Sequence, residues 1–160
     1  MSKYPVIIGR SESVDFTDIA LGVPAKVDSG AFRSAIHATN VKLKKVDGVE
    51  TLVCTLFGHP CAPIKRSFQT TKFSKVVVRS SNGQEEERYE VTLRVKIGSK
   101  VFNTSFTLTD RANNLFPVLI GRHALNRRFI INVAVAHIKK QQLLNDFGVT
   151  KPRDDEDLED

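Results

Sequence analysis

The chain has 160 residues and a formal net charge of +6, and 41% of its residues are hydrophobic. These values fit one globular domain with a short extension and enough apolar residues for a core. No apolar run reaches membrane-spanning length, which excludes a transmembrane helix, and the N-terminus lacks the features of a signal peptide. Two cysteines, Cys54 and Cys61, are too few for a disulfide framework and suit a reducing compartment. We therefore expect a soluble, cytoplasmic protein.

The positive charge is concentrated in the body of the chain. Residues 151–160 hold two basic and six acidic residues, so the rest of the chain keeps 22 basic and 12 acidic ones. These basic residues are scattered, and no nucleic-acid-binding motif organises them. A solvated basic surface is therefore favoured, and we expect neither nucleic acid nor a membrane as partner. The acidic segment has few apolar residues and is expected to be disordered.

The first part of the chain predicts short strands. Val, Ile, Thr and Phe are frequent, and Gly and Pro recur at short intervals, which is typical of an all-β fold. Asp47-Gly48 is a strong hairpin signal between two apolar stretches, and Gly58-His59-Pro60 breaks the pattern after the second stretch. The strands expected here are 6–9, 25–27, 41–46 and 52–57.

The second part of the chain has a clearer alternation of apolar and polar residues. Asn82-Gly83 predicts a type I′ turn between strands at 74–80 and 88–97. Apolar residues at every second position predict one buried face on 88–97 and another on 101–109. The remaining expected elements are a buried strand at 116–120, one or two helical turns at 121–126, a strand at 129–135 and a terminal helix at 137–147.

The segment after the strand at 25–27 carries the clearest motif, Asp28-Ser29-Gly30-Ala31. It resembles the Asp-Thr/Ser-Gly-Ala motif of aspartic peptidases. Asx turns also produce Asp-Ser-Gly, so a second segment matters. Val118-Leu119-Ile120-Gly121-Arg122 resembles the apolar-apolar-Gly-Arg segment of retroviral-type peptidases. On this resemblance, the Asn82-Gly83 hairpin takes the place of the flap that covers the substrate.

Further segments extend the match from Tyr4 to about Val135. They are 21–31, 34–38, 79–83, 106–111, 117–122 and 128–132. Together they resemble a bacterial retropepsin-like family once labelled ATP-dependent zinc proteases. The resemblance implies a closed β-barrel at 1–140, with one short helix after the Gly-Arg segment, and leaves a C-terminal helix and acidic tail at 141–160. Such genes often lie near ATP-grasp ligases that add glutamate, which implies a functional link to a ligase and a peptide or protein substrate rich in glutamate.

The resemblance implies an aspartic endopeptidase without a cofactor, with Asp28, Ser29 and Gly30 as its catalytic residues. In this class two carboxylates share one proton: the ionised one activates a water molecule, and the protonated one polarises the carbonyl of a peptide or isopeptide bond. The chain has one such motif and is too short for a second lobe. We therefore expect a homodimer in which each copy supplies one Asp28. Ser29 would tie the two loops together.

The expected substrate-binding residues are Ala31, Arg33, Asn82, Gly83 and Arg122. Retroviral enzymes place acidic residues after the motif, and one of these pairs with the Arg of the Gly-Arg segment. Here Phe32 and Arg33 follow instead. The sequence leaves open whether Arg122 has another partner or binds a substrate carboxylate.

The old family label suggests a zinc-dependent peptidase as an alternative. The candidate ligands are His37, Cys54, His59, Cys61, His123 and His137. None forms His-Glu-x-x-His, and the cysteines lack Cys-x-x-Cys spacing, so we expect no metal. Cys54 with His37 or His59 as base is a further alternative, although its apolar surroundings predict a buried strand. For His37 itself, a pocket role and a structural role are equally consistent with the sequence.

A binding module is the main competitor to an enzyme. A peptidase fold can persist as a peptide-binding or dimerisation domain after losing turnover. The intact Asp28-Ser29-Gly30 argues against that loss. A barrel that binds nucleic acid would need exposed aromatic residues along a basic groove, whereas most Phe residues here alternate as core residues do.

Overall fold

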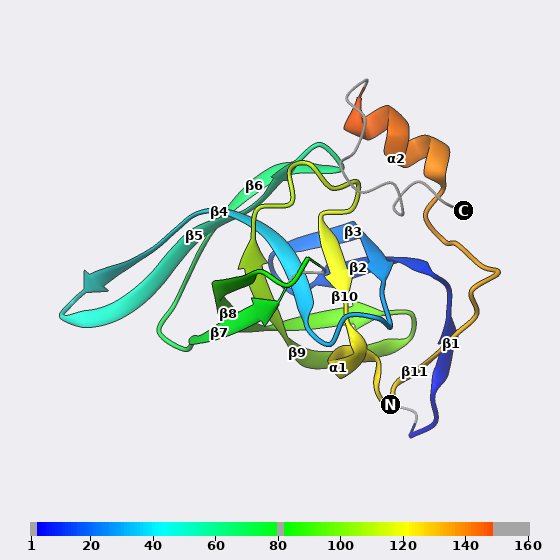
Figure 1. Ribbon diagram of the computed structural model, residues 1–160, viewed down its shortest axis with the longest axis horizontal. Helices are drawn as coiled ribbons and strands as arrows, with labels where there is room; N and C mark the ends of the chain where they lie inside the picture. Colours follow the sequence, from blue (N-terminus) through cyan, green and yellow to red (C-terminus); the bar gives the residue numbers. More distant parts are fainter. Residues whose placement is uncertain (1–2, 80–81, 149–160) are drawn as a thin grey trace.

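The computed structural model describes residues 3–79 and 82–148 and shows a mostly β domain with two short helices (Figure 1). The acidic segment at 151–160, for which disorder is expected, lies outside the described residues. Nine strands form one sheet, and a separate two-stranded sheet lies at its side.

Six strands of the large sheet close into a barrel. In order around the ring they are β10 (Val118–Ile120), β3 (Ala20–Val27), β2 (Ser11–Phe16), β8 (Glu85–Ile97), β9 (Lys100–Thr109) and β4 (Ser34–Val46). The short β10 closes the ring because it pairs in parallel with β3 and antiparallel with β4. Helix α1 (Arg122–Leu125) follows directly. The expected closed barrel and the short helix after the Gly-Arg segment are confirmed.

The barrel interior is filled from alternate positions of its strands. The predicted faces of β8 and β9 are confirmed: their buried apolar residues are Val91, Leu93, Val95, Ile97, Phe102, Phe106 and Leu108. Phe16 of β2 packs between Phe57 and Phe106, with ring centroids 5.5 and 5.4 Å away. Strand β2 was not predicted, because its sequence is polar and two of its polar residues, Ser11 and Glu12, are buried.

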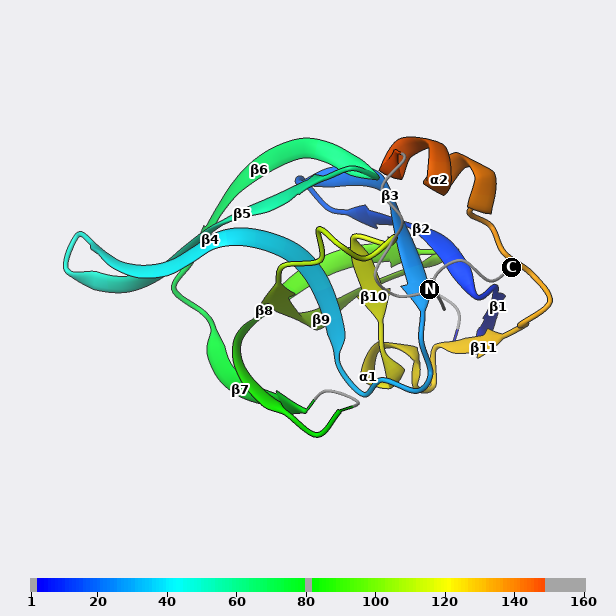
Figure 2. The ribbon, with the colours of Figure 1, turned by 45° about the horizontal axis from the view of Figure 1, so that its top comes forward.

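A long hairpin projects from the barrel as an arm (Figures 1 and 2). It is formed by β4 and β5 (Val49–His59), and β6 (Ala62–Thr70) extends the sheet beyond β5. The predicted turn is confirmed, since Asp47 and Gly48 both have positive φ. The sequence predicted that Gly58-His59-Pro60 ends the strand at 57, and this prediction is wrong. Positive φ at Phe57 and Gly58 instead makes a bulge, and β5 continues to His59.

A second hairpin joins β7 (Ser74–Arg79) to β8. Arg79 and Glu85 form its last described pair. Gly83 has a positive φ of 84°, as a type I′ turn requires. Residues 80–81 lie outside the described residues, so the type I′ turn at Asn82-Gly83 stays a prediction.

The two ends of the domain meet on one side of the barrel. Strands β1 (Val6–Ile8) and β11 (Phe129–Ile131) pair in parallel and form the two-stranded sheet. Strand β11 is shorter than the predicted 129–135, because the chain turns at Asn132, whose backbone N–H donates to Ile8. Helix α2 (Lys140–Phe147) buries Leu143 and Phe147 in a small second cluster with Cys61, Leu115 and Phe116.

Candidate active site

The loop that carries Asp28 follows β3 and is fixed by backbone hydrogen bonds. The Asp28 N–H donates to the Ile120 carbonyl oxygen over 2.9 Å, which joins the loop to β10. Asp28 Oδ1 accepts a hydrogen bond of 2.9 Å from the Gly30 N–H. Ser29 and Gly30 are exposed, and Asp28 is half-buried. The turn therefore presents a fixed carboxylate at the rim of the barrel.

The segment Gly121-Arg122 supports this loop from beneath. The Arg122 N–H donates to Ala31 over 2.7 Å, and the Gly121 N–H donates to Ser34 Oγ over 3.0 Å. A Cβ atom on Gly121 would lie 2.6 Å from the Arg33 carbonyl carbon and oxygen. Only glycine fits this approach, so Gly121 leaves room for the Asp28 loop.

The Arg122 side chain has partners within the domain, which the sequence had left open. Its Nη1 donates to the Ser29 carbonyl oxygen over 3.0 Å and to the Gly30 carbonyl oxygen over 3.1 Å. Its guanidinium carbon lies 5.7 Å from the Phe32 ring centroid. The partner of Arg122 is thus the backbone of the Asp28 loop, and the retroviral ion pair is replaced by these bonds.

Arg33 has an acidic partner that the sequence did not reveal. Its Nη1 lies 2.8 Å from Glu90 Oε2 on β8, and Glu90 is largely shielded from solvent. The two residues are 57 positions apart, and they meet only because β4, β9 and β8 lie side by side. No local pattern in the sequence signals a contact of this kind.

The surface beside Ser29 is hollowed, and polar and apolar side chains share its lining. A cavity of about 400 Å³ is lined there by Ser29, Phe32, Arg122, His123, Leu125, Asn126, Arg127, Phe129 and Ile131. Within the described part of the chain, the Ser29 hydroxyl makes no hydrogen bond. The adjoining two-stranded sheet exposes Ile7 (65%) and Ile130 (55%), which are direct pairing partners. This side of the domain therefore combines the catalytic-type loop with an unpartnered apolar face.

Asn82 and Gly83 lie at the tip of the β7–β8 hairpin, between the two strands in sequence. The Asn82 Oδ1 accepts a hydrogen bond from the Gln84 N–H. Figure 2 shows this end of the hairpin at the same end of the barrel as α1 and the segment between β3 and β4. Asp28, Ala31 and Arg33 thus belong to one loop, and Arg122 is hydrogen-bonded to that loop. The tip of the β7–β8 hairpin lies at the same end of the barrel (Figure 2).

His37 and His59 are buried behind β10 and shape the loop that leads to it. His37 Nδ1 accepts from the Arg111 N–H over 2.8 Å. His59 Nε2–H donates to the carbonyl oxygens of Asn114 and Arg111, and its Nδ1 accepts from the Cys61 N–H. Burial lowers the pKa of both histidines, and that of His59 falls to about 4. They are neutral structural groups.

The cysteines are also structural. Cys54 and Cys61 are free and buried, and burial raises their pKa values to about 11 and 12. A thiol with so high a pKa carries almost no nucleophilic thiolate near neutral pH. Cys54 is therefore unsuited to nucleophilic catalysis.

No group of three or more His, Cys, Asp or Glu suited to a metal ion occurs among residues 3–79 and 82–148. His59 uses both ring nitrogens in hydrogen bonds to the backbone, so neither is available as a ligand. His137 contacts the buried Glu12 carboxylate, and His123 packs against Phe32. His37 and His59 do lie together, with ring centroids 5.4 Å apart, and Cys61 adjoins His59, whereas His123 and His137 contact other groups.

Comparison with family models decides the relationship. The model of the RimB-like family, described as "Retropepsin-like aspartic endopeptidase RimB", matches residues 7–142. The chain belongs to this family. The match covers the whole barrel, the Asp28 loop and the beginning of α2.

Curated relatives of this RimB-like domain are larger proteins. A probable alpha-L-glutamate ligase of Shewanella pealeana is 34% identical over 139 residues, covering 82% of this chain and 29% of the relative. A probable alpha-L-glutamate ligase of Desulfotalea psychrophila is 32% identical over 133 residues, covering 81% and 28%. The chain thus spans less than a third of the length of these relatives.

A solved structure supports the fold of the RimB-like domain. A Legionella pneumophila protein of unknown function has a TM-score of 0.66 and 29% sequence identity, and the match covers 82% of this chain and 95% of that one. Within the described part of the chain, neither helix combines the length and hydrophobicity needed to cross a bilayer.

Proposed function

We propose that this RimB-like domain is an aspartic endopeptidase that uses Asp28 from each of two copies of the chain. The observation that carries the proposal is the Asp28 loop itself. Its carboxylate is fixed by the Gly30 amide, and Arg122 holds the Ser29 and Gly30 carbonyl groups. A preorganised carboxylate of this kind suits general acid–base chemistry on a water molecule.

The second carboxylate would come from a two-fold partner. The exposed apolar pair Ile7 and Ile130, the hollow beside Ser29, and the exposed Ser29 support an interface on this side. Two carboxylates brought to the axis could not both be ionised and would share one proton. The ionised Asp28 would take a proton from water as it attacks the amide carbon. The protonated Asp28 would polarise the carbonyl oxygen and then help to protonate the leaving amine.

The proposed substrate is a peptide or protein bearing glutamate, joined by a peptide or isopeptide bond. Two curated relatives that contain this domain are named probable alpha-L-glutamate ligases. A ligase that forms amide bonds to glutamate and a peptidase domain that hydrolyses them would act on the same product. In the cleft, Ala31 would contact the substrate, Asn82 and Gly83 would cover it from the hairpin, and Arg33 and Arg122 would favour carboxylates near the scissile bond.

The test is hydrolysis by the wild type and by Asp28→Asn, with glutamylated and ordinary peptides and products identified by mass spectrometry. The substitution removes the charge and keeps the shape, so we expect an intact fold and a rate at least ~10²–10⁴-fold lower, the contribution of general acid–base catalysis alone. Asp18→Asn is the matched control, because Asp18 is an exposed acid in the turn between β2 and β3 with a positive φ that Asn also tolerates. Equal activity in the wild type and Asp28→Asn would refute the aspartic mechanism. Peptide binding without turnover by the wild type would favour a binding module instead.

A further inference from the structure

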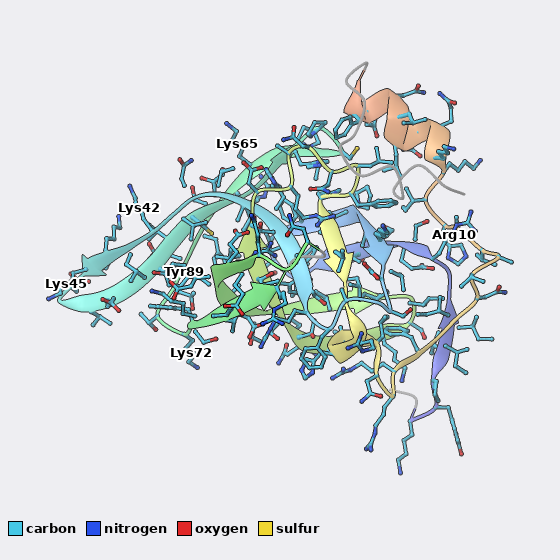
Figure 3. The ribbon with its side chains drawn as sticks, in the orientation of Figure 1. Arg10, Lys42, Lys45, Lys65, Lys72 and Tyr89 are labelled. Atoms are coloured by element: carbon cyan, nitrogen blue, oxygen red, sulfur yellow. The ribbon has the colours of Figure 1, made fainter. Side chains whose placement is uncertain are left out.

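The basic residues of the domain fall into a paired set and an unpaired set. On the β7–β8 hairpin, Arg79 lies 2.8 Å from Glu85 and Lys75 lies 3.9 Å from Glu87. The lysines of the arm and of the segment after β6 form the unpaired set. Within the described part of the chain, no carboxylate lies within ion-pair distance of Lys42, Lys44, Lys65 or Lys72. Figure 3 shows Lys42 and Lys45 along the arm and Lys72 below it, towards β7.

Lys72 lies at the junction of two hollows. One hollow, of about 510 Å³, lies against the arm. Its lining holds one acidic residue, Asp47, with Val46, Val49, Thr51, Gln69, Thr70, Thr71 and Lys72. The other, of about 560 Å³, lies on the outer side of β8 and β9 and includes Thr70, Lys72, Arg94 and Asn103. Because both hollows include Thr70 and Lys72, they adjoin at these residues, and we call the two together the groove.

This groove reaches the neighbourhood of the Asp28 loop. Glu90 lines the hollow on β8 and β9, and the same carboxylate pairs with Arg33, five positions after Asp28. A chain that left the catalytic cleft past Arg33 would therefore enter the groove at Glu90. It would then pass Arg94 and reach Lys72 beneath the arm.

The lining of the groove fits carboxylates better than nucleobases. Lys72 and Arg94 are exposed cations, Asn103 Oδ1 accepts from Arg94 Nη1 over 3.3 Å, and the charge of Glu90 is matched by Arg33. Threonine and serine hydroxyl groups line the floor. Base recognition in such a groove relies on exposed aromatic rings, whereas Phe73, the aromatic residue of the lining, is half-buried and packs against Tyr89.

We propose that this groove is an exosite for an acidic segment of the polypeptide substrate, outside the catalytic cleft. The inference rests on the proposed function, because it assigns the groove to the same substrate. Carboxylates of the bound segment would pair with Arg94 and Lys72, and hydroxyl and amide groups of the groove would bond to its backbone. The exosite would make the domain prefer long acidic chains over short peptides.

The first experiment compares two variants with the same change in charge. Lys72→Glu/Arg94→Glu alters the groove, and Lys65→Glu/Lys139→Glu alters exposed lysines that line neither hollow. Each is assayed on a short glutamyl peptide and on the same peptide extended by a run of glutamates. For the groove variant we expect the KM of the extended peptide to rise about tenfold, as loss of two partly exposed ion pairs implies, with kcat unchanged. An unchanged KM, or an equal rise in the control, would overturn the exosite.

The second experiment separates the exosite from catalysis. Binding of a fluorescent oligo-glutamate to the Asp28→Asn protein is measured with and without Lys72→Glu/Arg94→Glu. We expect binding that weakens with salt and is lost in the groove variant. Groove-dependent binding would stand even if the wild type hydrolysed nothing, in which case only the proposed function would fail. Binding of single-stranded RNA in the groove, with no binding of oligo-glutamate, would refute the acidic-polypeptide assignment.

Discussion

Arg122 donates from one nitrogen, Nη1, to the carbonyl oxygens of Ser29 and Gly30, at 3.0 and 3.1 Å. The arginine that follows the last barrel strand thus fixes the backbone that presents Asp28. In this position it acts on the geometry of the loop, and its charge remains at the edge of the proposed cleft.

The Arg122 bonds predict a graded loss of activity on substitution. Arg122→Met keeps an apolar stem over Phe32 but removes both hydrogen bonds, and kcat should fall at least about tenfold, since bonds from a charged donor contribute roughly 1.5–3 kcal/mol. Arg122→Lys should lose less, because a single ammonium group can reach both carbonyl oxygens. Steady-state kinetics on the two variants tests this order. Equal kcat in Arg122→Met and the wild type would contradict it.

Gly121 predicts a stability effect. Gly121→Ala places a Cβ 2.6 Å from the Arg33 carbonyl group, so the Asp28 loop or α1 must shift. Overpacking of this kind costs about 1–3 kcal/mol, and urea unfolding should show it as a lower midpoint. Gly48→Asn is the control, because Gly48 lies in an open turn with positive φ, which Asn tolerates. A stable Gly121→Ala protein would show that the contact relaxes freely.

The buried histidines predict a loss of stability in acid. Burial holds the pKa of His59 at about 4, below its value of 6.5 in the unfolded chain. Between these values the unfolded chain binds a proton that the folded protein does not, so stability falls as the pH drops from 6.5 towards 4. The maximum loss is roughly 3 kcal/mol from His59, and His37 shifts in the same direction.

Melting temperatures between pH 7 and pH 4.5 check this expectation. The slope should be shallower in His59→Gln, which does not titrate. A melting temperature that stays constant down to pH 4.5 in the wild type would contradict the burial of neutral histidines.

The sequence predicted those parts of the fold that depend on local pattern. The alternation at 88–97 and 101–109 has a period of two and directly gives the buried faces of β8 and β9. Strand β2 was missed because its buried Glu12 has a partner that no local pattern reveals: besides the nearby Gly9 N–H, its carboxylate contacts His137, which is 125 residues away. Glu90 was missed for the same reason, since its partner Arg33 lies 57 residues away. Contacts set by strand order leave no local signal.

The motif segments were predictable for a different reason. Gly121 is required by an approach of 2.6 Å to the backbone of Arg33, and Gly30 turns tightly beside Asp28. Steric demands of this kind allow few residue types at a position, so the sites that carry them can be recognised from a short stretch of sequence. The role of Arg122 was left open because its partners are carbonyl groups, which every residue offers.

The last prediction concerns the two-fold dimer, which should be visible in both association and activity. Ile7 and Ile130 are exposed pairing partners on the β1–β11 sheet. Ile7→Asp/Ile130→Asp would place two charges in the proposed apolar interface, at a large desolvation cost. Sedimentation should show weaker association, and specific activity should fall. Leu21→Asp/Ile64→Asp is the control, because Leu21 (79%) and Ile64 (63%) are similarly exposed elsewhere.

Mixing experiments test whether the dimer shares its catalytic pair. Excess Asp28→Asn protein added to the wild type should form mixed dimers with one carboxylate, so activity should fall below that of the wild type alone. The Asp28→Asn protein that also carries Ile7→Asp/Ile130→Asp should inhibit much less, because it associates poorly. Wild-type activity should also fall more steeply than linearly on dilution, as expected for a site completed by association. Activity that scales linearly with concentration and ignores added Asp28→Asn protein would mean that one chain suffices.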